Sequence, residues 1–457
     1  QPMTPFPMLP EAFSFEGQTL CCEQVPLPQL AQQYSTPLYI YSERALVDAY
    51  ESFKQACGEH PVQICFAVKA NPNLAILQTF ARLGAGFDIV SGGELARVAL
   101  AGACPSDIVF SGVGKSQAEL SQAVQAGVGC INVESEAELY RLNEVCISLG
   151  CVQPISLRVN PDIDPKTHPY ISTGLKDNKF GVAIEDARRL YPIAATLAGL
   201  KVIGVDCHIG SQITSLSPFI EAVERILSLI EQLAHAGLSI EHIDLGGGLG
   251  ICYHDETPPS PEAFMQAVLG PISAWAKRHG RPMPHIFFEL GRALVGSAGV
   301  LLTRVEMLKP SGQGRQFAIV DAAMNDLMRP SLYQAWHEVI PVRPRNPQDA
   351  QMWDLVGPIC ESGDWLAKDR LLALEPDDLL VLASAGAYGS SMGSQYNSRP
   401  RPAEVLIRSN GSHQVIRERE TIEHLIQSER GLLGEPFQLK GSIADAFEAP
   451  AAQVKQR

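Results

Sequence analysis

The feature that most constrains the fold is an alternation of short apolar runs with helix-like segments between residues 62 and 292. Strands that are apolar almost without interruption are typical of a parallel sheet whose two faces are covered by helices. Eight such units within about 240 residues predict a closed α/β barrel, TIM-like, with eight parallel strands. The predicted strands lie at residues 62–68, 86–90, 107–112, 129–133, 154–160, 202–210, 240–248 and 285–292.

The segments between these runs carry helix signals. Ser116 is followed by Glu119, and Ser135 by Glu138, which is the spacing of a capping box at a helix N-terminus. The segment 217–237 is amphipathic at helical spacing and ends in a glycine, which favours the end of a helix there. The sequence therefore predicts helices between the strands, as a barrel requires.

Polar residues stand at the ends of the predicted strands, where α/β barrels carry their chemistry. Lys69 is the most informative of them, because a lysine that ends a buried strand is costly unless it reaches water or has a chemical role. So many reactive groups at one barrel mouth predict an active site. These residues are Lys69, Asp88, Ser111, Glu134, Arg158, Asn160, His208, Gly246, Gly247, Gly248, Glu289 and Arg292.

The glycine run in "DLGGGLG" (244–250) follows the seventh strand, where such barrels commonly hold phosphate. The Walker pattern does not fit, since Val109 occupies its first glycine position. A phosphate site, a strand-end lysine and a carboxylate together suggest pyridoxal phosphate. In this interpretation Lys69 forms a Schiff base with the cofactor, and burial is expected to lower the pKa of its amine. A carboxylate keeps the pyridine nitrogen protonated.

The chain resembles the alanine-racemase-like barrel class of pyridoxal-phosphate enzymes and, within that class, the diaminopimelate decarboxylases. The resemblance runs from about residue 36 to residue 407 and beyond. Two positions depart from the family pattern: Phe66 replaces a tyrosine and Leu290 replaces a proline. The motifs that carry the resemblance are "FAVKAN" (66–71), "FDIVSGGEL" (87–95), "HIGSQ" (208–212), "LGGGLG" (245–250), "ELGR" (289–292), "MRPSLY" (328–333), "GPICESGD" (357–364) and "GAYGSSM" (386–392).

The resemblance implies a role for each matching residue. It makes Lys69, His208 and Cys360 catalytic: Lys69 bonds to the cofactor, His208 stacks on its ring, and Cys360 donates a proton. The implied cofactor-binding residues are Lys69, Asp88, His208, Ser211, Gly246, Gly247, Gly248, Glu289, Gly291, Arg292 and Tyr388, with Glu289 facing the pyridine nitrogen. The implied substrate-binding residues are Arg292, Arg329, Tyr333, Glu361 and Tyr388.

The activity that the resemblance implies is decarboxylation of meso-2,6-diaminopimelate to L-lysine and CO2. Arginines suit the far carboxylate of this substrate, and Glu361 suits its far amine. Decarboxylation of ornithine, arginine or carboxynorspermidine is an alternative. A racemase of the same class is less favoured, because there an arginine faces the pyridine nitrogen. A barrel that binds the cofactor without catalysis would have no use for "CESGD" (360–364).

A second domain is predicted after about residue 296, where the helical rhythm gives way to short strands between Gly/Pro-rich turns, an all-β pattern. Strands near the N-terminus are expected to join it. In the family, the segment with Cys360 reaches the partner subunit's barrel, so the resemblance implies a homodimer with shared active sites. The expected divisions are a disordered segment 1–12, N-terminal strands 13–45, the barrel 46–295, the β domain 296–430 and a flexible tail 431–457.

Composition limits the partners. A net charge of −14 without a Lys/Arg cluster argues against nucleic acid. No stretch of 18 apolar residues and no basic-then-apolar N-terminal signal is present, so a cytoplasmic protein without a membrane partner is expected. The 11 cysteines are scattered without a CxxC pair, so reduced thiols and no metal site are expected.

Overall fold

The computed structural model describes residues 6–429 and residue 431, and the chain in it forms two compact units. The barrel unit spans Leu46–Val295. The β unit combines the chain before Leu46 with the chain after Val295. No helix among the described residues is both long enough and apolar enough to cross a membrane.

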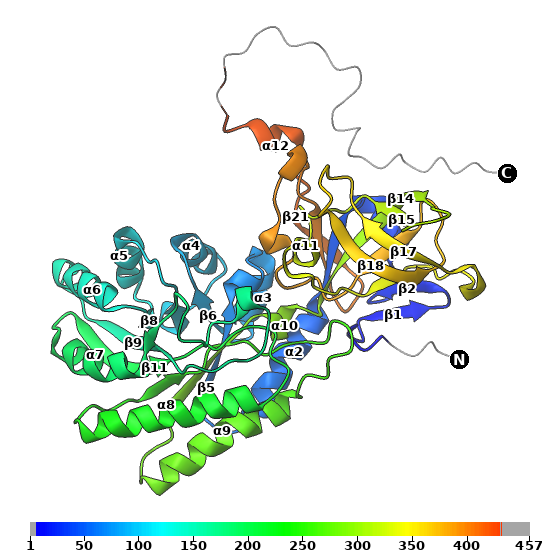
Figure 1. The fold of residues 1–457 in the computed structure, drawn as a ribbon. Coiled ribbons are helices and arrows are strands. Elements are labelled where there is room, and N and C mark those ends of the chain that lie inside the picture. Colours follow the sequence, from blue (N-terminus) through cyan, green and yellow to red (C-terminus); the bar gives the residue numbers. More distant parts are fainter. Residues whose placement is uncertain (1–5, 430, 432–457) are drawn as a thin grey trace. The chain divides into compact units, whose positions relative to one another are not determined.

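The barrel unit is built on eight parallel strands that close into a ring (Figure 1). Each strand pairs with its neighbour in chain order, and closure comes from the pairing of the first strand with the last. A short strand β10 (Val182–Ala183) pairs only with β9. The barrel strands are β5 (Val62–Ala67), β6 (Gly86–Ile89), β7 (Ile108–Phe110), β8 (Cys130–Val133), β9 (Gln153–Asn160), β11 (Leu200–Asp206), β12 (His242–Asp244) and β13 (His285–Leu290).

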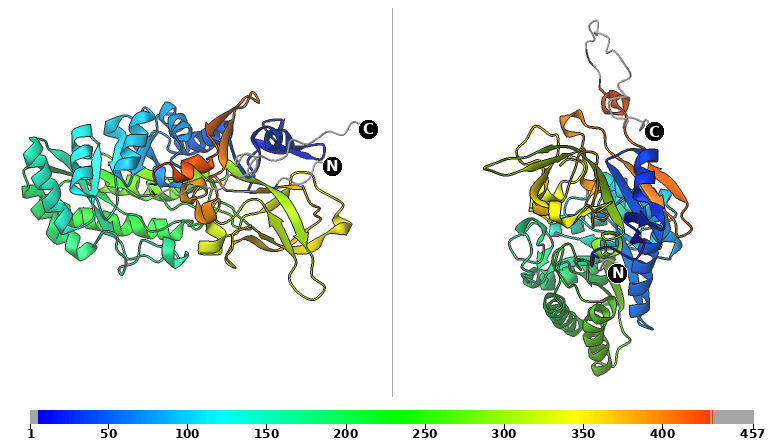
Figure 2. Two further views of the ribbon diagram at one scale, coloured as in Figure 1. Left: turned by 90° about the horizontal axis from the view of Figure 1, so that it is seen from above. Right: turned by 90° about the vertical axis from the view of Figure 1, so that its right-hand side faces the viewer.

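Helices follow the barrel strands and lie outside them in the views of Figures 1 and 2. The predicted capping box is complete at α5, where Ser116 and Glu119 bond to each other's backbone N–H groups. At α6 only the Ser135 half forms. The helices are α2 (Glu43–Ala56), α3 (Leu74–Arg82), α4 (Gly92–Leu100), α5 (Gln117–Ala126), α6 (Glu136–Leu149), α7 (Ile184–Thr196), α8 (Ser217–His235), α9 (Pro261–Arg278) and α10 (Arg292–Val295).

Both departures from the family pattern lie in the barrel core. Phe66 is fully buried in β5, and its ring centroid lies 4.5 Å from that of Phe80 on α3. Leu290 ends β13 and is also buried. Both side chains fill apolar space, and aromatic pairs at this distance add to the stability that burial provides.

The β unit contains a nine-stranded sheet that joins strands from both ends of the chain. The N-terminal β4 pairs antiparallel with β14 and parallel with β20, so it lies inside the sheet. β16 pairs with β19, which pairs with β14. The sheet comprises β4 (Leu38–Ser42), β14 (Gly299–Lys309), β15 (Phe317–Val320), β16 (Val339–Pro341), β17 (Gln351–Val356), β18 (Trp365–Leu372), β19 (Leu379–Leu382), β20 (Ala403–Ile407) and β21 (His413–Arg417).

Three further N-terminal strands form a sheet of their own in the β unit: β1 (Phe13–Glu16), β2 (Thr19–Cys22) and β3 (Val25–Pro26). The Leu20 N–H donates to the Val342 carbonyl at 2.9 Å, which ties this hairpin sheet to the segment after β16. The helices of the unit are α1 (Leu27–Tyr34), α11 (Arg329–Tyr333) and α12 (Ile422–Ile426), and α12 lies off the sheet in Figures 1 and 2.

The ends of the chain differ in part from the sequence expectation. Residues 6–12, expected to be disordered, form turns in which Met8 and Ala12 are buried. The Phe13 N–H donates to the Pro10 carbonyl at 2.9 Å, and the Leu9 N–H to the Phe6 carbonyl. Apart from residue 431, the predicted flexible tail lies outside the described residues, as do residues 1–5.

Candidate active site

Lys69 lies in a single 3-10 turn, Val68–Ala70, that directly follows β5. Its side chain is exposed in this chain, so the burial expected from the sequence is wrong. Within the turn Val68 and Ala70 are buried, whereas Lys69 between them is not. The positive charge of Lys69 acts on two residues of the barrel mouth: it opposes the rise that burial causes in the pKa of Asp88, and it adds to the lowering that burial causes in the pKa of His208.

Asp88 lies on β6 in register with Ala67 of β5, which brings its carboxylate beside the Lys69 turn. The side chain is buried, and desolvation raises the pKa of Asp88 to about 6. Lys69 and a hydrogen bond from Ser111 act in the opposite direction. Lys69 and Ser111, both predicted from the sequence as strand-end residues, therefore stabilise the negative charge of Asp88.

Glu289 belongs to a buried group of acids on three barrel strands. The carboxyl oxygens of Asp206, Asp244 and Glu289 lie within 4.8 Å of one another. Burial and mutual repulsion raise the pKa of Glu289 well above its usual range, and Asp244 shares a hydrogen bond with it. Among the described residues, the Glu289 Oε2 atom is buried without a hydrogen-bond partner. The group therefore favours a proton or a cationic N–H donor at Glu289.

The sequence reasoning missed Asp206 and Asp244, although its own strand-end rule could have found them. Asp206 is the last residue of β11, and Asp244 is the last residue of β12. The two are paired in register, and Asp206 is also in register with Arg158 of β9. Burial raises the pKa of Asp206 well above its usual range, repulsion from Asp244 adds to this rise, and Arg158 opposes it. Arg158 also forms an ion pair of 3.0 Å with Glu134, another predicted strand-end residue.

The glycine run after β12 allows three backbone segments to approach closely. Gly246 and Gly248 have φ of +67° and +97°, a region that favours glycine. A Cβ on Gly247 would lie 2.1 Å from the Glu289 carbonyl oxygen, and one on Gly248 would lie 2.4 Å from that of Gly210. The Gly246 N–H donates to Asp244, so not all of the expected phosphate donors are available for an anion.

His208 follows β11 and is half-buried. Its Nδ1 atom accepts a hydrogen bond from the Gly247 N–H at 3.1 Å, so a neutral ring carries its proton on Nε2. Desolvation, Lys69 and Arg158 all lower the pKa of His208, which favours the neutral ring. A neutral, oriented imidazole is suited to stacking on a flat ligand.

Arg292 lies directly after Gly291 at the end of β13, and its guanidinium is buried. Its Nη2 atom donates to the Ser211 hydroxyl at 2.9 Å, and Nη1 donates to the Tyr253 hydroxyl. Gly291 leaves room for Ala70, whose Cβ would lie 3.0 Å from a Cβ at this position. The structure therefore brings Arg292 and Ser211 together, as the site predicted from the sequence requires.

The other predicted residues belong to the β unit. Arg329 is buried at the start of α11, and its Nη1 donates at 2.9 Å to Nε2 of His337, a residue that the sequence reasoning missed. The other ring nitrogen of His337 lies 2.8 Å from the Ala383 carbonyl, so both contacts fit one neutral tautomer. The remaining residues are Tyr333 and Tyr388, which are half-buried, and Cys360 and Glu361, which are exposed.

The barrel residues fit pyridoxal phosphate. The buried Glu289 oxygen that has no hydrogen-bond partner among the described residues suits the N–H of a protonated pyridine ring. Gly248 carries no side chain, and its positive φ and close backbone contacts exclude one there, which suits a loop whose backbone N–H groups approach a phosphate. Lys69 is exposed in this chain, and its primary amine is the group that reacts with an aldehyde. Each of these three features matches a different part of the cofactor.

Comparison with known proteins finds a matching family and similar relatives that agree with each other. Residues 43–296 match the family described as "Pyridoxal-dependent decarboxylase, pyridoxal binding domain". The chain is 54% identical to the diaminopimelate decarboxylase of Vibrio cholerae, over 90% of this chain and 96% of the relative. It is 47% identical to that of Haemophilus influenzae, over 90% of this chain and 98% of the relative.

Solved structures with the same fold are also found. A diaminopimelate decarboxylase from Helicobacter pylori, complexed with L-lysine, superposes with a TM-score of 0.83 at 41% identity, covering 88% of this chain and 98% of that one. The corresponding M. jannaschii protein, in co-complex with L-lysine, gives 0.87 at 37% identity, covering 92% and 98%. The predicted architecture, a barrel with a separate sheet-rich unit, is confirmed.

Proposed function

This chain belongs to the diaminopimelate decarboxylase family of pyridoxal-dependent decarboxylases, and we propose that it removes CO2 from meso-2,6-diaminopimelate to give L-lysine. It is a carboxy-lyase whose cofactor is pyridoxal 5'-phosphate. When bound, the cofactor supplies an electron sink for the electron pair that remains when a carboxylate leaves as CO2. The residues of the chain bind and orient the cofactor and the substrate, and they donate or accept protons.

In this proposal the barrel holds the cofactor. The Lys69 amine would hold the cofactor through its aldehyde carbon, with release of water, and the Glu289 carboxylate would keep a proton on its pyridine nitrogen. His208 would stack on the cofactor ring, and the backbone at Gly248 and the Ser211 hydroxyl would hold the phosphate. The remaining residues proposed to bind the cofactor are Asp88, Gly246, Gly247, Gly291, Arg292 and Tyr388.

The observation that carries the proposal is the buried acid group at Glu289. A glutamate against the pyridine nitrogen, with a second acid hydrogen-bonded to it, favours a protonated ring. A protonated ring is a strong electron sink, which the loss of CO2 requires. An arginine in that place would leave the ring neutral, as the racemases of this class need. The site therefore supports decarboxylation over racemisation.

We assign the binding of the substrate's functional groups to residues of the β unit and to Arg292. Arg292, Arg329 and Tyr333 are proposed to bind the far carboxylate of diaminopimelate, and Glu361 its far amine. Cys360 is proposed to donate the proton that replaces the departed carboxylate at the same carbon. His337 would hold Arg329 in one orientation through the contact between Nη1 and Nε2.

The function is tested by supplying purified protein and cofactor with meso-diaminopimelate, ornithine, arginine or lysine, and measuring CO2 release and the product. We expect L-lysine and an equal amount of CO2 from meso-diaminopimelate, and far lower turnover of the rest. A preference for ornithine or lysine as substrate would contradict the assignment. Racemisation without CO2 release would contradict the reaction type.

A homodimer with shared sites is a further part of the proposal. Cys360 and Glu361 are exposed in the single chain, and we propose that they act at the barrel mouth of the partner subunit. Mixing inactive Lys69→Ala chains with inactive Cys360→Ala chains should then restore part of the activity. No restoration, despite demonstrated subunit exchange, would contradict shared sites. The cytoplasmic location expected from the sequence stays a prediction.

A further inference from the structure

We propose that Asp364, Asp326 and Arg399 are positioning residues that hold the Cys360 loop in place, and that Asn397 completes their hydrogen-bonded ring. The inference rests on the proposed function, in which Cys360 donates a proton to the substrate carbon. It gives a role to the polar segment 394–402, which the sequence marks only as a loop rich in proline and arginine.

Asp364 joins the Cys360 loop to the turn that precedes α11. Its Oδ2 atom accepts from the Ile359 N–H at 2.8 Å, one residue before Cys360. Its Oδ1 atom accepts from the Met324 N–H at 2.7 Å. The side chain is buried, and burial raises the pKa of Asp364 while both N–H donors lower it. One buried carboxylate therefore fastens two loops together.

Gly357 shows independently how closely these loops approach. A Cβ at this position would lie 2.6 Å from the Asp364 Oδ2 atom and 2.7 Å from the Ala322 carbonyl oxygen. Only a glycine leaves the backbone enough space here, because one of the atoms in the way is itself backbone. The start of "GPICESGD" is thus packed directly against the turn at 322–326.

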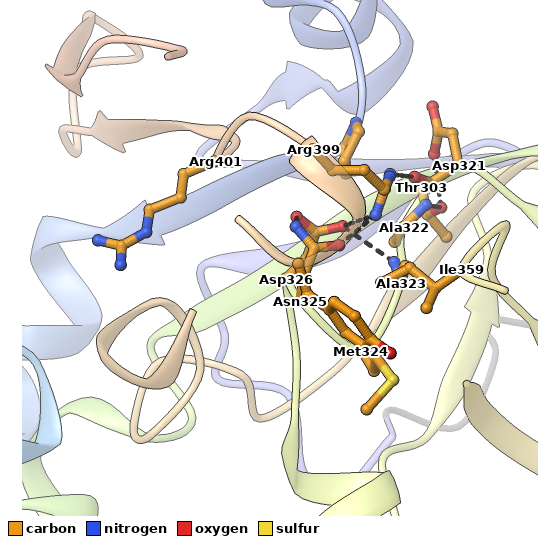
Figure 3. A network of polar contacts seen from close by, with 12 residues as sticks. Thr303, Asp321, Ala322, Ala323, Met324, Asn325, Asp326, Ile359, Arg399 and Arg401 are labelled. Atoms are coloured by element: carbon orange, nitrogen blue, oxygen red, sulfur yellow. Dashed lines mark hydrogen bonds and ion pairs between the residues drawn. The ribbon is translucent and has the colours of Figure 1, made fainter. Parts of the chain in front are cut away.

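Asp326 and Arg399 join the same turn to the segment after β19 (Figure 3). The Arg399 Nη1 atom lies 3.2 Å from Asp326 Oδ2 and also donates to Asn325, while Nη2 donates to the Asp321 carbonyl. Asp326 is almost fully buried and also accepts from the Ala323 N–H at 2.9 Å. In Figure 3, Arg399 reaches into this network, whereas Arg401 points away from it.

Asn397 closes the ring. Its side-chain oxygen accepts a hydrogen bond from the Cys360 N–H at 3.1 Å. The residue has φ of +60°, a conformation that asparagine tolerates better than most residues. It lies two residues before Arg399, so the arginine that anchors the segment also fixes the acceptor for the Cys360 backbone. The loop is therefore held on both sides, by Asp364 and by Asn397.

The ring also fixes the start of α11. Asp326 stands three residues before Arg329, whose guanidinium is proposed to bind the substrate, and the Ser331 hydroxyl donates to the Gly363 carbonyl at 2.7 Å. Cys360, the proposed proton donor, and Arg329, the proposed ligand of the substrate carboxylate, are thus held by the same set of hydrogen bonds. A displacement of about 1 Å at a reacting group can cost on the order of 100-fold in rate.

The first test compares Arg399→Lys with the matched control Arg401→Lys, from the same loop and with the same retained charge. A lysine cannot reproduce the contacts of Arg399 with three separate residues, because it lacks the planar fork of a guanidinium. We expect Arg399→Lys to lower kcat for meso-diaminopimelate by ~10- to 100-fold. Arg401→Lys should stay near the wild-type value, and the cofactor Kd should be unchanged in both variants.

A second pair covers the case in which Arg399→Lys fails to fold. Asn397 is exposed, so its replacement does not disturb the core. Asn397→Gly accommodates the positive φ but removes the acceptor for the Cys360 N–H, whereas Asn397→Asp retains an acceptor. We expect Asn397→Gly to lower kcat and Asn397→Asp to restore most of it.

A readout that does not depend on turnover is the alkylation rate of Cys360 by iodoacetamide, followed by peptide mass spectrometry. Cys104, which is exposed in the barrel unit, is the internal reference. We expect Arg399→Lys and Asn397→Gly to speed alkylation of Cys360 and leave that of Cys104 unchanged.

Wild-type kcat and alkylation rates in both variants would overturn the proposal. So would equal losses in the two controls, or matching changes at Cys104 and in the cofactor Kd, since these would indicate general damage. If the wild type decarboxylates none of the four substrates, the proposed function fails. The alkylation rates would still decide whether the ring holds the loop.

Discussion

Replacing Gly247 by alanine should weaken the binding of the cofactor to the barrel. The new Cβ would lie 2.1 Å from the Glu289 carbonyl oxygen, whereas a carbon and a carbonyl oxygen need roughly 3.3 Å. The two backbone segments must therefore separate by about 1.2 Å. No flexible side chain can absorb this shift, because the opposing atom is backbone on β13.

The size of the effect follows from what the shift moves. It displaces Glu289, the proposed partner of the pyridine nitrogen, and the Gly247 N–H that orients His208. Losing one charge-assisted hydrogen bond to the cofactor costs ~1.5–3 kcal/mol, which is ~10- to 150-fold in Kd. Overpacking should in addition destabilise the barrel by ~1–3 kcal/mol.

A matched control is available in the same barrel. A Cβ on Gly129 would lie 2.0 Å from the Ser106 carbonyl oxygen, an equally severe backbone contact. Gly129 precedes β8, at the end of the strands away from the proposed site. Titrating each cofactor-free variant with pyridoxal phosphate, and following absorbance and thermal unfolding, separates binding from stability. We expect both to lose stability and only Gly247→Ala to bind the cofactor weakly.

The reasoning fails if Gly247→Ala binds the cofactor as tightly as the wild type. It also fails if Gly129→Ala weakens binding by the same factor, because the loss would then reflect general loosening of the barrel. Equal unfolding temperatures for Gly247→Ala and the wild type would show that the backbone contact is relieved without cost.

Three further predictions concern single side chains. The folded-state pKa of Asp88, about 6, lies above its unfolded value, so its protonation stabilises the fold below about pH 4 and this contribution is lost as pH rises to 6. Asp88→Asn should therefore stabilise the cofactor-free protein by up to ~3 kcal/mol at pH 7 but little at pH 4, measured by urea unfolding. Lys69→Ala should abolish the absorbance of covalently bound cofactor and nearly all turnover, and retention of both would exclude the assigned role. Arg329→Ala should raise the KM for meso-diaminopimelate by roughly thirty- to several-thousand-fold without changing cofactor absorbance, unlike Arg343→Ala at an exposed site, and equal KM values for the two variants would contradict it.

The barrel could be predicted from sequence because its signal is local and repeated. Each of the eight apolar runs overlaps a barrel strand, although most strands end earlier than the runs do. The run 202–210, for example, ends as a strand at Asp206, where the chain turns out of the barrel wall. The rule that reactive residues stand at strand ends therefore predicts Lys69, Asp88 and Glu289 as site residues without any knowledge of their contacts.

What could not be predicted depends on contacts between distant segments. Arg399 lies 73 residues from Asp326, and Cys360 lies 37 residues from Asn397, and no local pattern records either pairing. The contact of His337 with Arg329 is closer in sequence, but a lone histidine after a short helix carries no signal of its own.

The buried acids lower the folding stability of the chain. Asp88, Asp244 and Glu289 all have raised pKa values because burial disfavours their charges, and repulsion from neighbouring acids adds to the rise at Asp88 and Glu289. A core built for stability alone would not place them together, since apolar residues of similar size would avoid the desolvation cost. A protonated pyridine ring beside Glu289 would offset that cost by supplying the missing positive charge. The same acids that destabilise the empty barrel would then favour the protonated cofactor on which decarboxylation depends.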